Sequence, residues 1–423
     1  MLAFLALLLI VHRSARPEGR AAAALVATSG PVAGWAVGGL ETAGFALAAT
    51  AALLAAERTM DAGPSPGAAR KAFAAGCLCG LAEWTRPEGA LIAAVLLAAL
   101  AAAWVRRRGA APAPLASAAA GFALLFVPRL AARVLYYGDW VPNTAHVKVS
   151  SGLSDLGLGV EYVVRCLSFT PVLALMGLCA AFRLLRGRTG AGEKMLFALL
   201  AIWTAYVIQV GGDHMPWYRF VVPMIPIVTV LGVRSLPRAI PLRLAVPALA
   251  CIGLASAAAT TWIKAWNEPD PAARYGGAVG RWIHEQWPAD ALVALNTAGS
   301  TAYFGGMPCI DMLGLNDRAI ATRRMPPPPS DLKWALKPGH RKGDGAYVLS
   351  RRPDYVILGG SAGEGLDKPW FSGDRELAES PEFRAGWMLR EADIPANGTL
   401  PPVHFKYFER RDRLSAPPAA TAP

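Results

Sequence analysis

The distribution of apolar residues along the chain constrains its fold more than any other feature. Residues 1–263 consist of one apolar stretch after another, separated by short loops, whereas the sequence from Lys264 onward has the mixed composition of a soluble domain. Hydrophobic residues make up 54% of the chain and charged residues only 17%, which is typical of a multi-spanning membrane protein with a soluble part. The pattern predicts a helical membrane domain at 1–263, an α/β domain at 264–413 and a disordered Pro- and Ala-rich tail at 414–423.

Ten apolar segments are candidates for crossing a membrane, at 1–12, 21–35, 40–56, 72–84, 90–105, 113–135, 161–182, 195–210, 220–233 and 241–263. A membrane span needs about 20 apolar residues, so the short segments 21–35 and 72–84 are either half-helices or extend into their loops. The run after Met1 has neither a preceding basic region nor a following small-residue cleavage site. We interpret it as the end of a membrane helix whose beginning is missing.

The positive charge of the chain belongs to its membrane half. Residues 1–263 carry 22 Lys and Arg against 11 Asp and Glu, whereas the rest of the chain is almost balanced, at 20 against 19. If each apolar segment crosses once, alternate loops hold 16 basic residues in one set (13–20, 57–71, 106–112, 183–194 and 234–243) and 3 in the other (36–39, 85–89, 136–160 and 211–219). The positive-inside rule predicts that the first set is cytoplasmic and that the second, with the C-terminal domain, faces outward. A charge excess confined to membrane loops argues against a nucleic-acid-binding face.

The stretch 211–226, which reads GGDHMPWYRFVVPMIP, places ionisable and aromatic residues between two membrane-length apolar runs. Charged groups at that position are costly unless they line a polar site, so Asp213, His214, Tyr218 and Arg219 are candidate functional residues. The alternative is a solvated loop between helices. Three further polar motifs fall on the same predicted outer face, at 39–42, 85–89 and 136–144.

The C-terminal domain offers weaker signals. A helix is expected at 278–286 and strands at 291–295 and 354–358. Polar clusters at 311–317 and 339–344 could contact a glycan, but Asp, Asn and Gly also favour turns, and we prefer the turn interpretation. The six cysteines show neither a disulfide framework nor a zinc-ligand spacing, although a divalent metal is not excluded.

In combination, the polar motifs resemble those of a known enzyme family. They are GLET at 39–42, TRPEG at 85–89, YYGDWVPNT at 136–144 followed by Lys148, and GGDHMPWYRF at 211–220. Together they resemble the GT-C superfamily of polyprenyl-phosphate-sugar glycosyltransferases, most of all the terminal arabinofuranosyltransferases of the mycobacterial cell wall. The likeness extends to YFGGMPCIDMLGLND at 303–317 and GHRKGD at 339–344.

This resemblance implies a GT-C-like helix bundle in a bacterial-type inner membrane with its C-terminal domain on the periplasmic side. Such an enzyme transfers a sugar from a polyprenyl-phosphate donor to a glycan or another cell-envelope acceptor. The cations expected at the donor phosphate are Arg219, His214, Arg86 and Lys148.

The remaining motif residues are expected to position the substrate. Asp139 and Asp213 would orient the sugar or help to bind a metal, and Asn143 would bind the substrate. Tyr218 beside Arg219 is available for stacking, although aromatic residues also gather at a membrane surface without any function. Two of these assignments have structural alternatives: Asp139 in an interfacial turn and Glu88 as a helix cap, although Glu88 is also retained as a substrate-binding candidate.

The family pattern places a catalytic Asp in the first outward loop, but residues 36–39 contain none. The catalytic base is therefore unknown. Either the chain lacks its natural start, or it is a catalytically incomplete relative that acts as a membrane-anchored glycan-binding protein. A transporter is a further alternative. The sequence does not identify the donor sugar, which could be arabinofuranose, another pentose or mannose.

Overall fold

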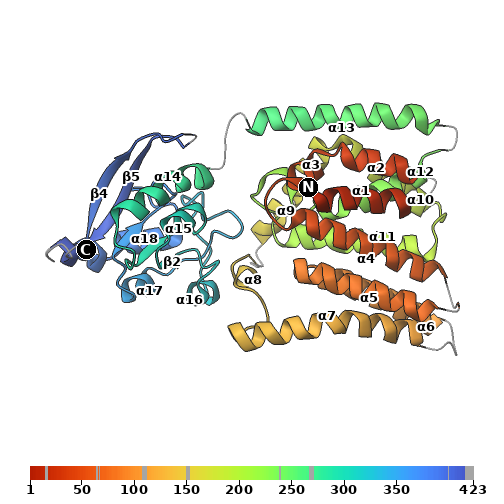
Figure 1. The fold of residues 1–423 in the computed structure, drawn as a ribbon, viewed down its shortest axis with the longest axis horizontal. Helices are drawn as coiled ribbons and strands as arrows, with labels where there is room; N and C mark the ends of the chain where they lie inside the picture. Colours follow the sequence, from red (N-terminus) through yellow and green to blue (C-terminus); the bar gives the residue numbers. More distant parts are fainter. Residues whose placement is uncertain are drawn as a thin grey trace. The chain divides into compact units, whose positions relative to one another are not determined.

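The computed structural model describes residues 1–14, 18–62, 65, 67–106, 112–148, 153–237, 240–265, 271–398 and 400–414. The chain divides into two compact units (Figure 1). The helical unit comprises Met1–Trp140 with Gly152–Ile263, and the mixed α/β unit comprises Val141–Ser151 with Lys264–Pro423.

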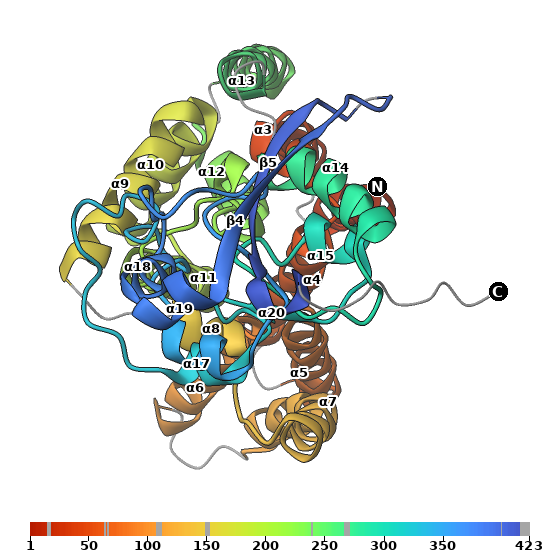
Figure 2. The same ribbon diagram turned by 90° about the vertical axis from the view of Figure 1, so that its left-hand side faces the viewer.

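The helical unit is made of long helices joined by short loops, and several of these helices run side by side. Helices α7 and α13 are seen end-on in Figure 2. Its elements are α1 (Leu2–Ser14), α2 (Gly19–Ala27), α3 (Gly30–Ala36), α4 (Thr42–Ala62), α5 (Ala68–Thr85), α6 (Gly89–Arg106), α7 (Ala113–Tyr137), α9 (Leu153–Phe169), α10 (Pro171–Leu185), α11 (Ala191–Gln209), the 3₁₀ helices η1 (Pro216–Tyr218) and η2 (Val222–Met224), α12 (Ile225–Ser235) and α13 (Leu242–Ala265).

Five stretches of helix are long and apolar enough to cross a membrane. They are Gly89–Arg106, Ala113–Tyr137, Ala191–Gln209, Pro216–Ser235 and Leu242–Thr260. A sixth is formed by Asp155–Phe169 and Pro171–Leu185 if that bent pair is one span. The structure thus agrees with the expected multi-pass helical membrane protein, with five or six such helices among the described residues where ten apolar segments were expected.

Breaks, bends and charged residues explain why fewer helices than expected are long and apolar enough to cross a membrane. The expected segment 21–35 is broken at Thr28–Ser29, where α3 restarts with Pro31 in its first turn. The expected segment 161–182 bends by 103° at Thr170, because Pro171 donates no backbone hydrogen bond and disfavours helical geometry in the residue before it. Segments 40–56 and 72–84 do form the long helices α4 and α5, but both include charged residues near their ends.

Helices α5 and α7 pack with their backbones in direct contact. A Cβ placed on Gly76 would lie 2.1 Å from the carbonyl oxygen of Ala118, and one on Gly121 would lie 2.2 Å from that of Phe73. Gly76 and Gly80 are four residues apart, the spacing that lets membrane helices approach closely. Only glycine fits at these positions, so the α5–α7 pair is specified by its sequence.

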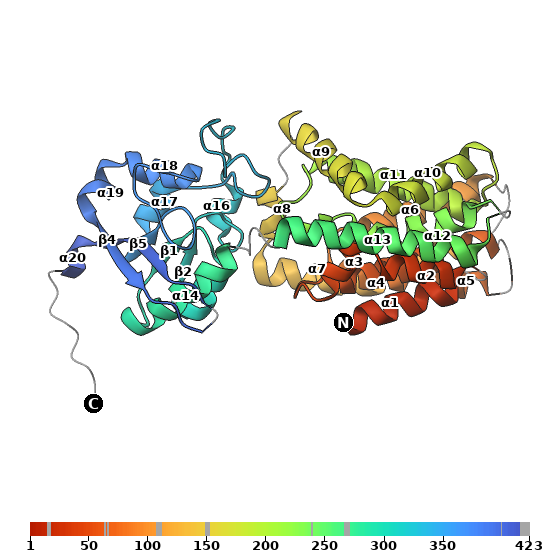
Figure 3. The same cartoon turned by 90° about the horizontal axis from the view of Figure 1, so that it is seen from above.

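The α/β unit is built around a five-stranded sheet with the order β2-β1-β3-β5-β4. Its elements are α8 (Asn143–Lys148), α14 (Pro271–Gln286), β1 (Val293–Leu295), α15 (Ser300–Gly305), β2 (Cys309–Asp311), α16 (Arg318–Thr322), α17 (Gly345–Ser350), β3 (Tyr355–Ile357), α18 (Ser372–Glu379), α19 (Pro381–Gly386), β4 (Trp387–Ile394), β5 (Val403–Arg410) and α20 (Arg411–Leu414). Strands β1, β2 and β3 pair in parallel, whereas β5 pairs antiparallel with both β3 and β4. The β4–β5 hairpin is visible in Figures 2 and 3.

Alternation along the strands gives this unit a core on each face of the sheet. Val293 and Leu295 of β1 pack with α14 on one face, whereas Ala294 belongs to the core on the other face, which includes residues of α16 to α19. The strands expected at 291–295 and 354–358 are confirmed as β1 and β3, and the expected helix at 278–286 lies within α14. All six cysteines are free, in keeping with the sequence.

Candidate functional site

The stretch 211–220 is an irregular loop after α11 whose backbone is held in unusual conformations. Gly211 and Gly212 both have positive φ, and a Cβ on Gly212 would meet the Tyr162 ring at 2.5 Å. Trp217 and Tyr218 also have positive φ, at 62° and 49°, which is costly for aromatic residues. The surrounding structure must therefore stabilise this loop, and two sets of polar contacts do so.

The first set is the ion pair between Asp213 and Arg219. Arg219 Nε donates to Asp213 Oδ2 at 2.7 Å, and the Met215 backbone N–H donates to Asp213 Oδ1 at 3.2 Å. The two side chains are only 3% and 9% exposed, so each is satisfied inside the protein. His214, with 38% of its side chain exposed, is the member of this group that a ligand can reach most easily.

The second set surrounds Arg86 in the turn between α5 and α6. Its guanidinium donates to Glu41 at 3.0 Å and to Glu88 at 2.6 Å, and the Tyr206 hydroxyl donates to Glu88 at 3.2 Å. Arg86 and Glu88 are largely buried, whereas 40% of the Glu41 side chain is exposed. Glu88 therefore serves as the partner of Arg86, and Glu41 is the accessible carboxylate of this group.

The Phe220 ring joins the two sets. Its centroid lies 5.2 Å from the Arg86 guanidinium carbon and 5.6 Å from that of Arg219, distances at which cations interact with an aromatic ring. Trp203 Nε1 donates to the Phe220 carbonyl at 2.7 Å. Three motifs that are distant in sequence, at 39–42, 85–89 and 211–220, therefore form one cluster, which we call the arginine cluster: Glu41, Arg86, Glu88, Tyr206, Asp213, His214, Arg219 and Phe220.

A second polar cluster gathers residues from the basic set of loops. Arg234 bonds to Glu57 and lies 3.7 Å from Glu193, which also pairs with Arg183 at 3.3 Å. Asp61 accepts from the Gly192 N–H at 2.9 Å. Glu41 and Glu57 are separated by 16 residues of α4, or about 24 Å at the rise of an α-helix. The two sets of loops defined by charge thus form separate clusters at opposite ends of α4.

A partly open pocket lies beside the strained aromatic residues. It is bounded by the break between α2 and α3, the bend between α9 and α10, and one side of α13, and Trp217 and Tyr218 line it. Tyr218 also contacts Tyr162 edge-on at 5.4 Å between ring centroids. Tyr218, which the sequence suggested as a stacking residue, therefore lines this pocket beside the arginine cluster.

The motif at 136–144 spans the division between the two units, which falls between Trp140 and Val141. Asp139 follows Gly138, whose positive φ of 64° ends α7, which places it at a turn. Asn143 is the first residue of α8 and belongs to the α/β unit. The Lys148 side chain lies outside the described residues.

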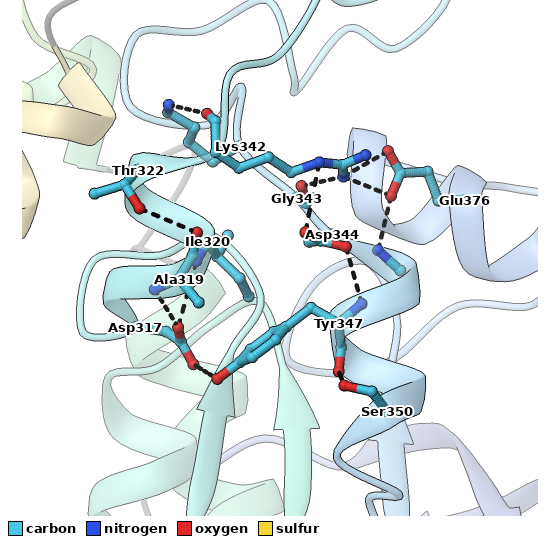
Figure 4. A network of polar contacts seen from close by, with 12 residues as sticks. Asp317, Ala319, Ile320, Thr322, Lys342, Gly343, Asp344, Tyr347, Ser350 and Glu376 are labelled. Carbon is cyan, nitrogen blue, oxygen red and sulfur yellow. Dashed lines mark hydrogen bonds and ion pairs between the residues drawn. The ribbon is translucent and has the colours of Figure 1, made fainter.

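The polar clusters of the α/β unit are engaged in local structure, as the turn interpretation expected. Asp311 accepts from the backbone N–H groups of Leu313 and Asn316, and burial nevertheless raises its pKa above the ordinary value. Asp317 and Asp344 cap the N-termini of α16 and α17, and Tyr347 donates to Asp317 at 3.1 Å (Figure 4). These carboxylates are used within the fold.

Sequence reasoning missed two buried acidic residues. Glu83 pairs with Arg129 of α7 from inside the apolar helix α5, and a charge within an apolar run was the available signal. Asp374, which is fully buried, accepts from the Asn296 side chain at 2.8 Å and from three backbone N–H groups. Burial raises the pKa of Asp374 to about 6. Nothing in its local sequence indicates that role.

Comparison with known proteins adds one match. Residues 265–407 fit the model of a family described as a domain of unknown function, DUF8728, which covers most of the α/β unit. No curated protein matches the chain. Among the residues that the structure describes, no group of three or more His, Cys, Asp or Glu could hold a metal ion.

Proposed function

We propose that this chain is a membrane glycosyltransferase that moves a sugar from a polyprenyl-phosphate donor to an extracytoplasmic glycan or another cell-envelope acceptor. The observation that carries the proposal is the arginine cluster, in which three of the four motifs of the family resemblance meet. A lipid-linked donor keeps its chain in the bilayer and its phosphate at the interface, so its site belongs where membrane helices end in polar loops.

The charges of the arginine cluster suit a substrate with both a phosphate and hydroxyl groups. Arg86 is held by Glu88 from one side and bonds to the more exposed Glu41 through a second nitrogen. A donor phosphate can replace Glu41 at that nitrogen without disturbing the buried Glu88 contact, because Glu41 is exposed to solvent. Glu41 is then free to accept a hydrogen bond from a sugar hydroxyl.

The buried pair of Asp213 and Arg219 has a different role in this proposal. Its two side chains bond to each other and not to solvent, so the pair fixes the loop that carries His214. His214 then supplies the second donor group toward the phosphate. In the reaction, the acceptor oxygen bonds to the anomeric carbon, the phosphate departs with the electrons of the broken C–O bond, and the proton of the acceptor hydroxyl passes to the departing phosphate or to water.

Sugar transfer in reconstituted liposomes tests this proposal. The full chain is supplied in turn with radiolabelled polyprenyl-phosphate donors that carry arabinofuranose, another pentose or mannose. The release of free polyprenyl phosphate is measured with a cell-envelope glycan as acceptor. Glu41→Gln and His214→Gln should each lower the rate by about tenfold or more, since each removes a charged contact to the substrate. Both residues are exposed, so stability should change by no more than about 0.5 kcal/mol.

Arg165→Gln is the matched control, because Arg165 is 67% exposed and pairs with Glu161 on the surface of α9. It should leave the rate unchanged. The proposal fails if the wild-type chain releases polyprenyl phosphate from none of these donors. Binding of donor without any release would instead favour the non-catalytic glycan-binding alternative.

A further inference from the structure

Helix α7 carries two arginines on one face of an otherwise apolar stretch. Arg129 is paired with Glu83 of α5, whose carboxylate accepts from Arg129 Nε at 2.6 Å and also contacts a terminal nitrogen. Arg133 lies four residues further along α7, one turn away on the same face. The Glu83 carboxylate thus pairs with Arg129 and not with Arg133.

Arg133 has no ion-pair or hydrogen-bond partner within the part of the chain that the structure describes. Its Nε is buried and unsatisfied. An N–H group removed from water without an acceptor is costly, and the cost is larger for a charged group. Glu83, Arg129 and Arg133 together therefore carry one net positive charge, and the Arg133 Nε–H has no acceptor among the described residues.

If Ala113 lies at one face of a membrane, Arg133 lies at the depth of the lipid headgroups of the other face. Ala113 and Arg133 are 20 residues apart, or about 30 Å along the helix, which is the thickness of a bilayer's hydrocarbon core. Only Ala118 and Gly121 of α7 are buried, so most of the helix is left for contact with lipid.

The alignment of α7 with α5 also indicates where Arg133 lies along the two helices. The helices run in parallel, with Gly76 opposite Ala118, Gly80 opposite Leu125 and Glu83 opposite Arg129. One turn beyond Glu83, the chain enters the Arg86–Glu88 turn. Arg133 is therefore level with the edge of the arginine cluster.

We propose that Arg133 binds the phosphate group of a membrane lipid. Arg133 as a whole is only half-buried, so its terminal N–H groups, and not the buried Nε, would meet a phosphate, whose oxygens arginine can bind with two parallel N–H groups. The lipid is either an isoprenyl monophosphate, which would extend the proposed donor site, or a phospholipid diester of the surrounding bilayer. This assignment stands on the unpartnered guanidinium and does not depend on sugar transfer.

Binding to the full chain, purified in a neutral detergent without phospholipid, tests the proposal. Native mass spectrometry measures the affinity for farnesyl phosphate, for dihexanoyl phosphatidylglycerol and for inorganic phosphate. We expect one of the two lipids to bind and Arg133→Gln to weaken it about tenfold or more, because a charge-assisted hydrogen bond is lost. The lipid that binds more tightly identifies the source of the phosphate.

The control is again Arg165→Gln, which removes an exposed arginine that already has a partner. Wild-type affinity in Arg133→Gln, equal weakening in Arg165→Gln, or inorganic phosphate binding as tightly as the lipids would each overturn the proposal.

Arg133→Gln should melt at the wild-type temperature or above in the absence of lipid, since it removes an uncompensated charge. Should this variant fail to insert, Arg133→Lys replaces it and should bind with intermediate affinity, since the charge is kept and the paired N–H geometry is lost.

Discussion

Replacing Asp374 by asparagine should change how the stability of the α/β unit depends on pH. The carboxylate is fully buried, and burial raises its pKa from 3.8 to about 6. Between these values the folded protein keeps a proton that the unfolded chain has released, so the free energy of unfolding falls as the pH rises. This contribution is complete below pH 3.8 and is lost as the pH passes 6.

The size of the effect follows from the two pKa values. The gap from 3.8 to about 6, at about 1.4 kcal/mol per pH unit, amounts to about 3 kcal/mol in total. Somewhat less than half of it, about 1 kcal/mol, is lost between pH 5 and pH 7. Asparagine does not titrate, so the difference in stability between wild type and Asp374→Asn should shift by that amount over this range.

The hydrogen bonds of Asp374 explain why asparagine is the appropriate substitution. One carboxylate oxygen accepts from three backbone N–H groups, which an amide oxygen can still do, and the other accepts from Asn296. Asn296 has a buried Oδ1 without a partner, which can turn toward the new amide. Asp374→Ala leaves the three backbone donors unsatisfied and removes one of the two acceptors of Asn296 Nδ2, so it should cost about 3–5 kcal/mol.

Hydrogen exchange followed by mass spectrometry can measure these changes in the full chain in detergent. The peptides that cover β1 and β3 report unfolding of the α/β unit, after correction for the intrinsic pH dependence of exchange. Asp393→Asn is the control, because 90% of the Asp393 side chain is exposed. Parallel pH profiles for wild type and Asp374→Asn would show that the pKa of Asp374 is not raised.

Two further predictions concern the helical unit, and thermal unfolding in detergent measures both. Gly76→Ala should separate α5 from α7 and cost about 2 kcal/mol or more, because its Cβ would lie 2.1 Å from the Ala118 carbonyl oxygen. Gly44→Ala, which meets nothing within 4 Å, should be neutral or stabilising by up to about 1 kcal/mol, and an equal loss in both variants would contradict the packing argument. Glu83→Gln should cost about 2 kcal/mol by removing the buried carboxylate that pairs with Arg129, whose side chain is 18% exposed, whereas the exposed Glu161→Gln should change stability by less than about 1 kcal/mol.

The sequence predicted the parts of the fold that depend on local pattern. Short continuous apolar runs at 291–295 and 354–358 predicted the positions of two strands, because a strand that is buried on both faces reads as a short apolar run bounded by turn residues. The charge difference between alternate loops also anticipated that Glu41, Arg86 and Asp213 would be grouped apart from Glu57 and Arg234. The apolar runs depend only on neighbouring residues, and the charge difference between loops depends only on the side of the membrane that each loop faces.

What the sequence left open depends on contacts between distant segments. The choice of Arg219 as a phosphate ligand could not take account of its burial against Asp213. The roles of Asp374 and Asn296 arise from partners 78 positions apart, and Arg133 differs from Arg129 only because Glu83 reaches one of them. Such assignments need the packed structure.

Photocrosslinking of a lipid-linked donor tests the central claim, that the arginine cluster binds a polyprenyl-phosphate sugar. A diazirine placed on the sugar of an isoprenyl-phosphate donor is activated in membranes that contain the full chain, and the labelled peptides are identified by mass spectrometry. The proposal predicts labels on the peptides that contain Glu41, Arg86 or His214, and their loss with excess unlabelled donor. Labels confined to the α/β unit, or labels that persist against excess donor, would contradict it.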